Sequence, residues 1–365
     1  MAARRAGRIT VRDTPARTDY TPERLAEQIA RLPRRCLAFL PTPLQELPRL
    51  SAAIGNVRVV VKRDDQTGLA LGGNKTRMLE FTLGRALADG SDCVVAASYA
   101  DSNHCRQAAA AAARLGLDSF LVLGIHNHEP APQGNLLLDR LLGARIEFVR
   151  ARNVSDISGA AAARVEALRA AGRKPFLLTY ALDARVLGTI AHAAAFLELT
   201  AQLEEADLYP HSIYVASGGN TYAGLLLGAV LTGSAIRVVG IMPEGRRDDA
   251  CGQVDTLAHR AAARLGMPLH TIPSVELDDT YLGAGYGVPS REGNEALLLA
   301  ARTEGLLLDP VYTAKGMAGL IGHMRAERIP AGSTVLFVHT GGTPAIFEWA
   351  AQLGALEATG ERHPA

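Results

Sequence analysis

Residues 57–81 read VRVVVKRDDQTGLALGGNKTRMLEF, and this stretch decides the fold. Its first part, VRVVVKRDD over residues 57–65, is a short apolar run that ends in charge, which is typical of a buried strand. Gly72 and Gly73 then interrupt the chain, and we predict a helix from there to about Asp89. A buried strand, a glycine-rich turn and a helix together make one step of an alternating β–α chain.

The same alternation continues to the end of the sequence. We predict strands at 93–98, 120–124, 145–149, 175–180, 212–217, 237–241 and 334–340. Helical stretches lie between them, such as 106–116, 158–172 and 188–206. Short apolar strands that alternate with amphipathic helices predict an α/β fold with parallel open sheets. In such sheets ligands bind at the carboxyl ends of the strands, so the turns that follow the strands are the candidate sites for binding and catalytic residues.

The composition is that of a soluble globular protein with two domains or one large one. The chain has 365 residues, 48% of them hydrophobic and 21% charged, and a formal net charge of +1. Near-neutral charge argues against nucleic acid as the main partner. No run of about 18 apolar residues lacks a charge or a turn former, so we expect no membrane span.

Cysteines, histidines and the start of the chain add further expectations. Four cysteines without a C-x-x-C pair fit a reducing cytoplasm. His126 and His128 have no evident third ligand, and we expect no metal site. The Arg-rich start, residues 1–20, has no apolar core and too many acids for a transit peptide. We expect it to form a flexible arm.

Lysine is rare in this chain, which narrows the search for a reactive amine. The four lysines are Lys62, Lys75, Lys174 and Lys315. Lys62 ends a strand and should reach solvent or an ion pair, Lys174 lies in a polar turn, and Lys315 is ambiguous. Lys75 lies at a helix start, where the dipole favours the neutral amine that a Schiff base requires. An ordinary first-turn lysine is the alternative.

A second glycine-rich turn, SGGNT over residues 217–221, follows an apolar strand and precedes a helix. Unpaired N–H groups at the helix start, together with the hydroxyls of Ser217 and Thr221, would cradle a phosphate. A turn that binds nothing is the alternative. The GGNKT turn is no nucleotide P-loop, because Asn74 separates its glycines from the lysine. A reactive lysine and a separate phosphate cradle suggest pyridoxal phosphate.

Dense motifs in matching order connect the sequence to one family. They are LAFLPTPLQEL, VVVKRDDQTGLALGGNKTRMLEF, DSNHCRQAAAAAARLG, GNLLLDRLLGA, GAGYGVPSREG, ARTEGLLLDPVYTAKGMAGL and FVHTGGTPAIF. From about Leu37 to Phe347 the chain resembles the fold type II pyridoxal-phosphate enzymes, in the branch of D-cysteine desulfhydrase, aminocyclopropane-carboxylate deaminase and L-cysteate sulfo-lyase. The resemblance implies a homodimer with a tryptophan synthase β-like fold. It implies a large cofactor-binding domain over 21–77 and 187–365 and a small domain over 78–186.

The matching positions imply a set of site residues. The catalytic ones are Lys75, as Schiff-base lysine and carrier of the Cα proton, Ser102, Tyr286 and Tyr312. Those that bind the cofactor are Lys75, Asn74, Ser217, Gly218, Gly219, Asn220, Thr221 and Thr313, the last facing the pyridine nitrogen. Those that bind the substrate are Ser102, Asn103, His104 and Tyr286. Without the resemblance, Ser102 and His104 could be helix caps, and the tyrosines could be turn or core residues.

Two positions separate the branches of the family. The ring-opening deaminases carry Glu where Thr313 stands and Gln where His104 stands. A carboxylate would keep the pyridine nitrogen protonated and the cofactor a strong electron sink, whereas a neutral hydroxyl leaves a weaker sink. The weaker sink suffices for β-elimination. Both positions therefore favour the desulfhydrase and sulfo-lyase side.

The sequence also departs from the family pattern. Asp101 stands where Gln is usual, residues 180–185 (YALDAR) replace a Gly-Gly-Ser type loop, and Asn220 and Tyr222 replace Gly and Gln. We expect the substrate pocket to be altered by Asp101, Tyr99, Tyr180, Asp183 and Arg185. A carboxylate near the substrate's own carboxylate or sulfonate would repel it, which counts against cysteine and cysteate themselves.

We predict a cytoplasmic lyase that acts on a small amino acid with a leaving group at Cβ and yields a keto acid and ammonia. The alternatives with the same cofactor are β-replacement, racemisation and ring opening. A protein that binds the cofactor without turnover is the alternative from another class, and the unusual Asp101 and Asp183 would support it.

Overall fold

A computed structural model describes residues 20–125 and 130–358 of the chain. The predicted N-terminal arm, apart from its last residue, lies outside the described residues. His126 and His128 lie outside them too.

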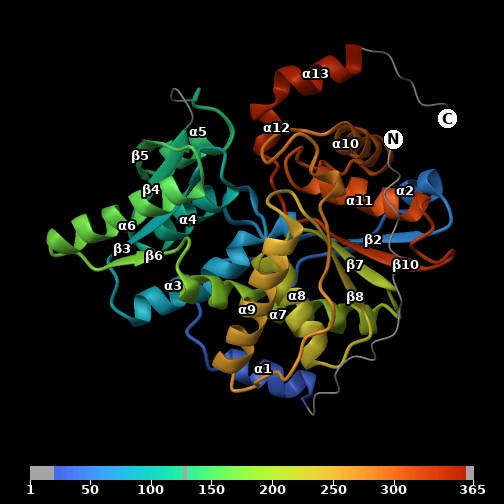
Figure 1. Ribbon diagram of the computed structural model, residues 1–365, viewed down its shortest axis with the longest axis horizontal. Coiled ribbons are helices and arrows are strands. Elements are labelled where there is room, and N and C mark those ends of the chain that lie inside the picture. Colours follow the sequence, from blue (N-terminus) through green and yellow to red (C-terminus); the bar gives the residue numbers. More distant parts are fainter. Residues whose placement is uncertain (1–19, 126–129, 359–365) are drawn as a thin grey trace.

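Two sheets organise the described chain (Figure 1). The larger has the order β1-β2-β10-β7-β8-β9, and the smaller has the order β5-β4-β3-β6. The strands of the larger sheet are β1 (Leu44–Glu46), β2 (Arg58–Lys62), β7 (Ser212–Ala216), β8 (Arg237–Ile241), β9 (Glu276–Asp278) and β10 (Thr334–Val338). Those of the smaller are β3 (Cys93–Tyr99), β4 (Asp118–Ile125), β5 (Arg145–Arg150) and β6 (Pro175–Leu177). All neighbours are parallel except β1 and β2, which are antiparallel.

Helices cover both faces of each sheet. Around the larger sheet lie α1 (Pro22–Ala30), α2 (Pro48–Ile54), α7 (Leu182–Glu205), α8 (Asn220–Leu231), α9 (Arg247–Arg264), α10 (Arg291–Glu304) and α11 (Thr313–Arg325). With the smaller sheet lie α3 (Lys75–Ala88), α4 (Asn103–Leu115), α5 (Gly134–Leu141) and α6 (Val154–Ala170). Two short helices end the described chain, α12 (Ala345–Glu348) and α13 (Ala350–Ala358). The predicted α/β fold with parallel sheets flanked by helices is confirmed.

Strand β2 shows how the core is divided. Val60 packs with α7, α8 and α9 on one face of the larger sheet. Val59 and Val61 pack with α10 and α11 on the other face. Successive strand residues point to opposite faces, so an apolar run such as VVV contributes side chains to the hydrophobic core on both sides of the sheet. The smaller sheet is divided in the same way between α4 and α6.

Helix α7 is long and apolar enough to cross a membrane by length and composition, but 67% of its apolar window is buried inside the fold. It packs against α3 and α8. Its apolar character is therefore explained by its place in the core.

The structure differs from the predicted elements mainly at their ends. Strand β6 stops at Leu177 rather than at Tyr180, because the Thr179 hydroxyl, rather than a backbone carbonyl, accepts from the Ala97 N–H at 3.0 Å. Helix α4 begins three residues early, at Asn103, since Ser102 caps it. The edge strands β1 and β9 were missed, because three residues are too few for a hydrophobic pattern. The predicted domain limits fall inside α3 and α7, which join the two sheets, and remain a prediction.

Candidate active site

The loops that follow the parallel strands bring the predicted site residues to the carboxyl ends of both sheets. Ser102 follows β3, the SGGNT turn follows β7, and Thr340 follows β10. The start of α3 contacts these loops, because the Asn74 N–H donates to the Thr340 carbonyl at 3.0 Å and the Asn74 amide donates to Thr221 Oγ1 at 2.9 Å. This is where parallel α/β sheets bind their ligands.

Lys75 is the first residue of α3, directly after Gly73 and Asn74. Gly73 has φ = +127°, and a Cβ there would come within 2.4 Å of Gln107 Nε2, so only glycine fits. Burial lowers the pKa of Lys75, and the carboxylate of Glu244 opposes the shift. This direction agrees with the predicted preference for the neutral amine, and burial is its leading cause.

The other three lysines have ordinary roles. Lys62 Nζ is buried and donates to the Thr42 carbonyl at 2.7 Å and to Glu198 at 2.6 Å, so the predicted ion pair is confirmed. Lys315 Nζ donates to two backbone carbonyls at 2.9 and 3.0 Å, which settles the ambiguous case as a structural lysine. Lys174 is exposed.

The turn at residues 217–221 has the form of an anion cradle. Ser217 Oγ accepts from the Gly219 N–H at 3.1 Å, and α8 begins at Asn220. A Cβ on Gly219 would meet nothing within 4 Å, so open space lies beside it. Thr221 Oγ1 lies 2.9 Å from the Asn74 amide nitrogen and 3.2 Å from His192 Nε2. His192 was missed by the sequence analysis, because a histidine in an alanine-rich helix gives no signal of its own.

The turn of Ser102, Asn103 and His104 begins α4. Ser102 Oγ accepts from the Cys105 N–H at 3.3 Å, so the capping role considered as an alternative does occur. Asn103 Oδ1 accepts from the Asn135 amide at 3.2 Å. Burial, with a smaller effect from the Lys75 cation, lowers the pKa of His104 to about 4. His104 is therefore neutral, and its buried Nε2 has no hydrogen-bond partner.

Tyr286 and Tyr312 form a pair, although they lie in different loops. Their hydroxyl oxygens are 2.6 Å apart, and their rings are 6.0 Å apart at 72°. Tyr99 packs against the other side of the pair, with its ring 6.0 Å from that of Tyr286. Burial raises the pKa of Tyr286 and of Tyr312 well above the usual value, and Asp101 and Glu244 raise both further. Both phenols therefore stay protonated.

Thr313 is buried and bound to Asp309. Its Oγ1 donates to Asp309 Oδ1 at 2.6 Å and accepts from the Asp309 N–H at 2.8 Å. The same carboxylate accepts from the N–H groups of Val311, Tyr312 and Thr313 at 2.8 to 2.9 Å. Asp309 thus orders the whole start of α11.

Several unusual residues noted in the sequence join these groups, and one does not. Asp101 Oδ1 is buried without a hydrogen-bond partner. Arg185 lies beside the phosphate turn, where its carbonyl accepts from the Asn220 amide at 2.9 Å. Asp183 instead pairs with Arg264 of α9, and its effect on the pocket stays a prediction. Glu244 was missed, because it lies in a polar loop after β8 that resembles ordinary surface.

These features fit pyridoxal phosphate. Lys75 supplies an amine of lowered pKa, and the glycine turn leaves room for a phosphate. Asp101 Oδ1 and His104 Nε2 are buried without a hydrogen-bond partner in the protein, so both can bind a ligand. Among the described residues, no three His, Cys, Asp or Glu side chains are placed to hold a metal ion.

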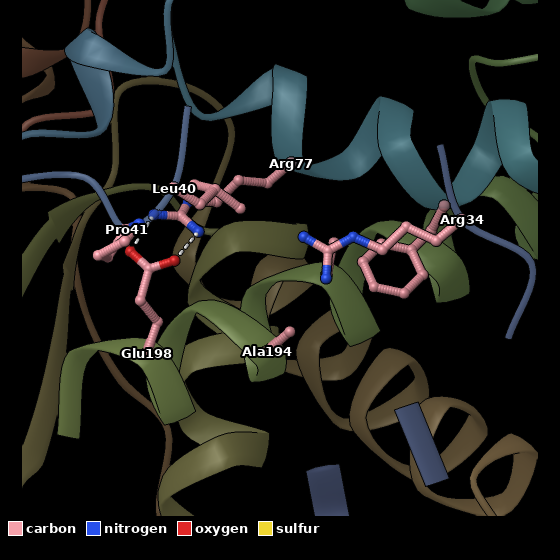
Figure 2. Close-up of a pocket in the computed structure, with 8 residues that line it drawn as sticks. Arg34, Leu40, Pro41, Arg77, Ala194 and Glu198 are labelled. Carbon is pink, nitrogen blue, oxygen red and sulfur yellow. Dashed lines mark hydrogen bonds and ion pairs between the residues drawn. The ribbon is translucent and has the colours of Figure 1, made fainter. Parts of the chain in front are cut away.

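A cavity of about 360 Å³ lies elsewhere, between α3, α7 and the segment around residues 34–41 (Figure 2). None of the predicted site residues lines it. Figure 2 shows Arg77 and Glu198 paired at one side and Arg34 reaching in from the other. The Arg34 guanidinium lies 5.0 Å from the centre of the Phe81 ring.

Polar loops at the strand ends of two parallel sheets, with a lysine of lowered pKa among them, define an α/β enzyme that works on a small molecule. The family model described as pyridoxal-phosphate dependent enzyme matches residues 36–341. The chain therefore belongs to this family, and its cofactor is pyridoxal phosphate.

Known relatives and structures agree. A D-cysteine desulfhydrase of Klebsiella pneumoniae (strain 342) is 38% identical over 331 residues, which are 88% of this chain and 98% of the relative. One of Salmonella typhi is 38% identical over 327 residues, covering 88% and 97%. A crystal structure of an ACC deaminase homologue matches with a TM-score of 0.83 and 34% identity, covering 91% of this chain and 99% of that one. O-ureido-L-serine synthase, 16% identical with a TM-score of 0.62, shows the fold alone.

Proposed function

We propose that this enzyme is a lyase that removes a substituent from Cβ of a small amino acid and releases a keto acid and ammonia. The observation that carries the proposal is the place of Lys75 at the start of α3, directly after Asn74, whose amide donates to Thr221 of the turn at 217–221; burial lowers the pKa of the lysine amine. The 38% identity to D-cysteine desulfhydrases supports elimination as the reaction. A homodimer in the cytoplasm is part of the proposal.

When bound, pyridoxal phosphate supplies an aldehyde that captures amines and a ring that accepts electrons from Cα. The protein's part begins with the turn at 217–221, whose N–H groups and Thr221 hydroxyl hold the phosphate. Asn74 fixes Thr221 in place through its hydrogen bond. This contact joins the loop to the start of α3, so the turn that would hold the phosphate is fixed relative to Lys75.

Lys75 is the residue that would hold the cofactor, and its amine would also take the proton from the substrate's Cα. A neutral amine is required for both tasks, and burial favours that form. The N–H groups at the start of α4, with Ser102 and Asn103, bind the substrate's carboxylate. Tyr286 and Tyr312 keep their protons and can donate to a departing group.

The test combines spectroscopy and mapping of the modified lysine. Purified enzyme should show the visible absorbance of lysine-bound cofactor, and Lys75→Ala should lose it while Lys174→Ala keeps it. After borohydride reduction, the label should lie on the Lys75 peptide. Small D- and L-amino acids with a Cβ leaving group should yield keto acid and ammonia in equal amounts. Enzyme without bound cofactor, or a label on another lysine, would overturn the proposal.

A further inference from the structure

Four tyrosines and two acids lie at strand ends or in loops near Lys75. They form what we call the tyrosine–acid cluster, which comprises Tyr99, Tyr180, Tyr286, Tyr312, Asp101 and Glu244. Glu244, which is exposed, is the acid whose charge acts on the Lys75 amine. From this cluster we infer that the substrate carries a second positive charge, an ammonium or amidinium group at or just beyond Cβ. The inference rests on the proposed function and names the class of amino acid on which it acts.

The cluster is assembled from loops at the ends of different strands. Tyr99 ends β3, Tyr180 follows β6 and Glu244 follows β8. The Tyr99 and Tyr286 rings lie 6.0 Å apart at 39°, and those of Tyr286 and Tyr312 lie 6.0 Å apart at 72°. Tilted and edge-to-face rings of this kind pack on one another, and a ring face that is not covered can bind an ammonium group.

Tyr180 adds a fourth ring at a backbone position that suits glycine. It has φ = +62°, in the left-handed region where a large side chain is disfavoured. The side chain of Tyr180 is 36% exposed, and its pKa is raised by partial burial and by Cys105, Glu244 and Tyr99, so this ring lies at the exposed edge of the cluster. Strained residues of this kind gather at binding sites, where their side chain has a function.

Asp101 gives the cluster an uncompensated carboxylate. Its Oδ1 is buried without a hydrogen-bond partner, and Oδ2 lies 3.9 Å from where a Cβ would stand on Gly287. Its pKa is raised, first by burial. Burial therefore favours the neutral carboxyl unless donors reach it, and a bound cation would supply the charge that stabilises the ionised form.

The two acids of the cluster lie where the surrounding protein disfavours negative charge. Desolvation by that protein raises the pKa of Asp101 and of Glu244, so both carboxyl groups favour the neutral form while no cation is bound. Of the described cations, Lys75 and Arg185 act on Glu244, whereas Arg106 donates to the Gly72 carbonyl at 2.8 Å and to Asn135 at 3.0 Å. A thiolate or sulfonate at Cβ would add negative charge beside these acids, whereas an ammonium group would favour their ionised form.

The chemistry balances without an oxidant or an acid. Lys75 takes the Cα proton, and the Cβ–N bond breaks with its electron pair leaving on nitrogen. An ammonium substituent departs as neutral ammonia and needs no proton from Tyr286 or Tyr312. Water then releases the Cα nitrogen. With 2,3-diaminopropionate the products are two ammonia molecules and one pyruvate.

The test compares three β-substituents of different charge on the holoenzyme. The probes are 2,3-diaminopropionate (cationic), β-chloroalanine (neutral) and cysteate (anionic), each as both enantiomers. Wild-type enzyme should have its highest kcat/KM for the cationic probe and release two ammonia molecules per keto acid from it. Asp101→Asn should lower the ratio of cationic to neutral kcat/KM about tenfold and improve cysteate, because the variant removes charge and keeps shape.

Controls separate the two levels of the argument. Asp183→Asn removes a carboxylate paired with Arg264, outside the cluster, and should leave the three-probe order unchanged. Turnover of β-chloroalanine by Asp101→Asn shows that the variant is folded and holds its cofactor. If wild-type enzyme turns over β-chloroalanine but prefers cysteate, or if Asp101→Asn leaves the ratio unchanged, the inference is overturned and the proposed function stands. If no probe changes the cofactor's absorbance, the proposed function itself fails.

Discussion

Replacement of Arg77 by methionine should cost about 3–5 kcal/mol of folding free energy, the usual cost of breaking a buried ion pair. Arg77 is 3% exposed and lies two residues after Lys75. Its guanidinium donates to Asp64 at 2.9 and 2.8 Å and to Glu198 at 2.9 and 2.8 Å, and the latter pair is visible in Figure 2. Asp64 is 2% exposed, so the variant leaves its carboxylate without the arginine partner in a place that water cannot reach.

A matched surface variant isolates the effect of burial. Arg58 makes a similar two-point contact with Glu46 at 3.2 and 2.6 Å, but both side chains are about half exposed. Arg58→Met should therefore cost at most about 1 kcal/mol. Arg77→Lys should fall between, because one ammonium cannot span both carboxylates.

Urea denaturation, followed by circular dichroism and by the fluorescence of the single tryptophan, gives the comparison. If Arg77→Met and Arg58→Met differ by less than about 1 kcal/mol, the reasoning from burial is refuted. The same result would mean that Lys62, which already binds Glu198 at 2.6 Å, takes over the vacant partners.

Three further outcomes follow from single contacts. Gly224→Ala should destabilise by about 3 kcal/mol in thermal denaturation, because its Cβ would come within 2.3 Å of a backbone oxygen of α7. Thr221→Val should weaken cofactor binding about tenfold in a titration of the visible absorbance, because it loses the hydroxyl that Asn74 holds. Burial opposes the shift, but the hydrogen bond from His323 lowers the pKa of Asp278, so its stabilising effect is full above about pH 4 and is lost as pH falls. Asp278→Asn should be less stable than wild type at pH 7 and equal to it in acid, as measured by denaturation at both pH values.

The fold could be predicted because each central strand carries its own signal. Apolar runs such as VVVK at 59–62 and VLFV at 335–338 are long enough to identify buried strands, and both pair in the larger sheet. Edge strands of three residues have no such pattern. The end of β6 could not be predicted from the sequence either, because it depends on a contact between Thr179 and Ala97, which lie 82 residues apart in the chain.

Site residues could be predicted where the function depends on a rare residue type or on a turn that is local in the sequence. Lys75 stood out because only four lysines compete, and the turn at 217–221 because its glycines precede a helix. Glu244 and His192 were missed, since each acts through neighbours that are distant in the chain. The ion pair of Asp183 could not be foreseen for the same reason, because its partner Arg264 lies on another helix.

Thr313 shows why a residue type alone does not determine electronic character. From the sequence, Thr313 is expected to present a neutral hydroxyl to the pyridine nitrogen and so to leave the cofactor a weak electron sink. The structure places that hydroxyl against the Asp309 carboxylate at 2.6 Å, while the Asp309 N–H occupies one of its lone pairs. The hydroxyl proton is thus directed toward Asp309, and the free lone pair on Oγ1 can only accept. A threonine in this setting favours a group that donates a hydrogen bond to its Oγ1. The position that separates the two branches of the family therefore depends on Asp309 as much as on Thr313.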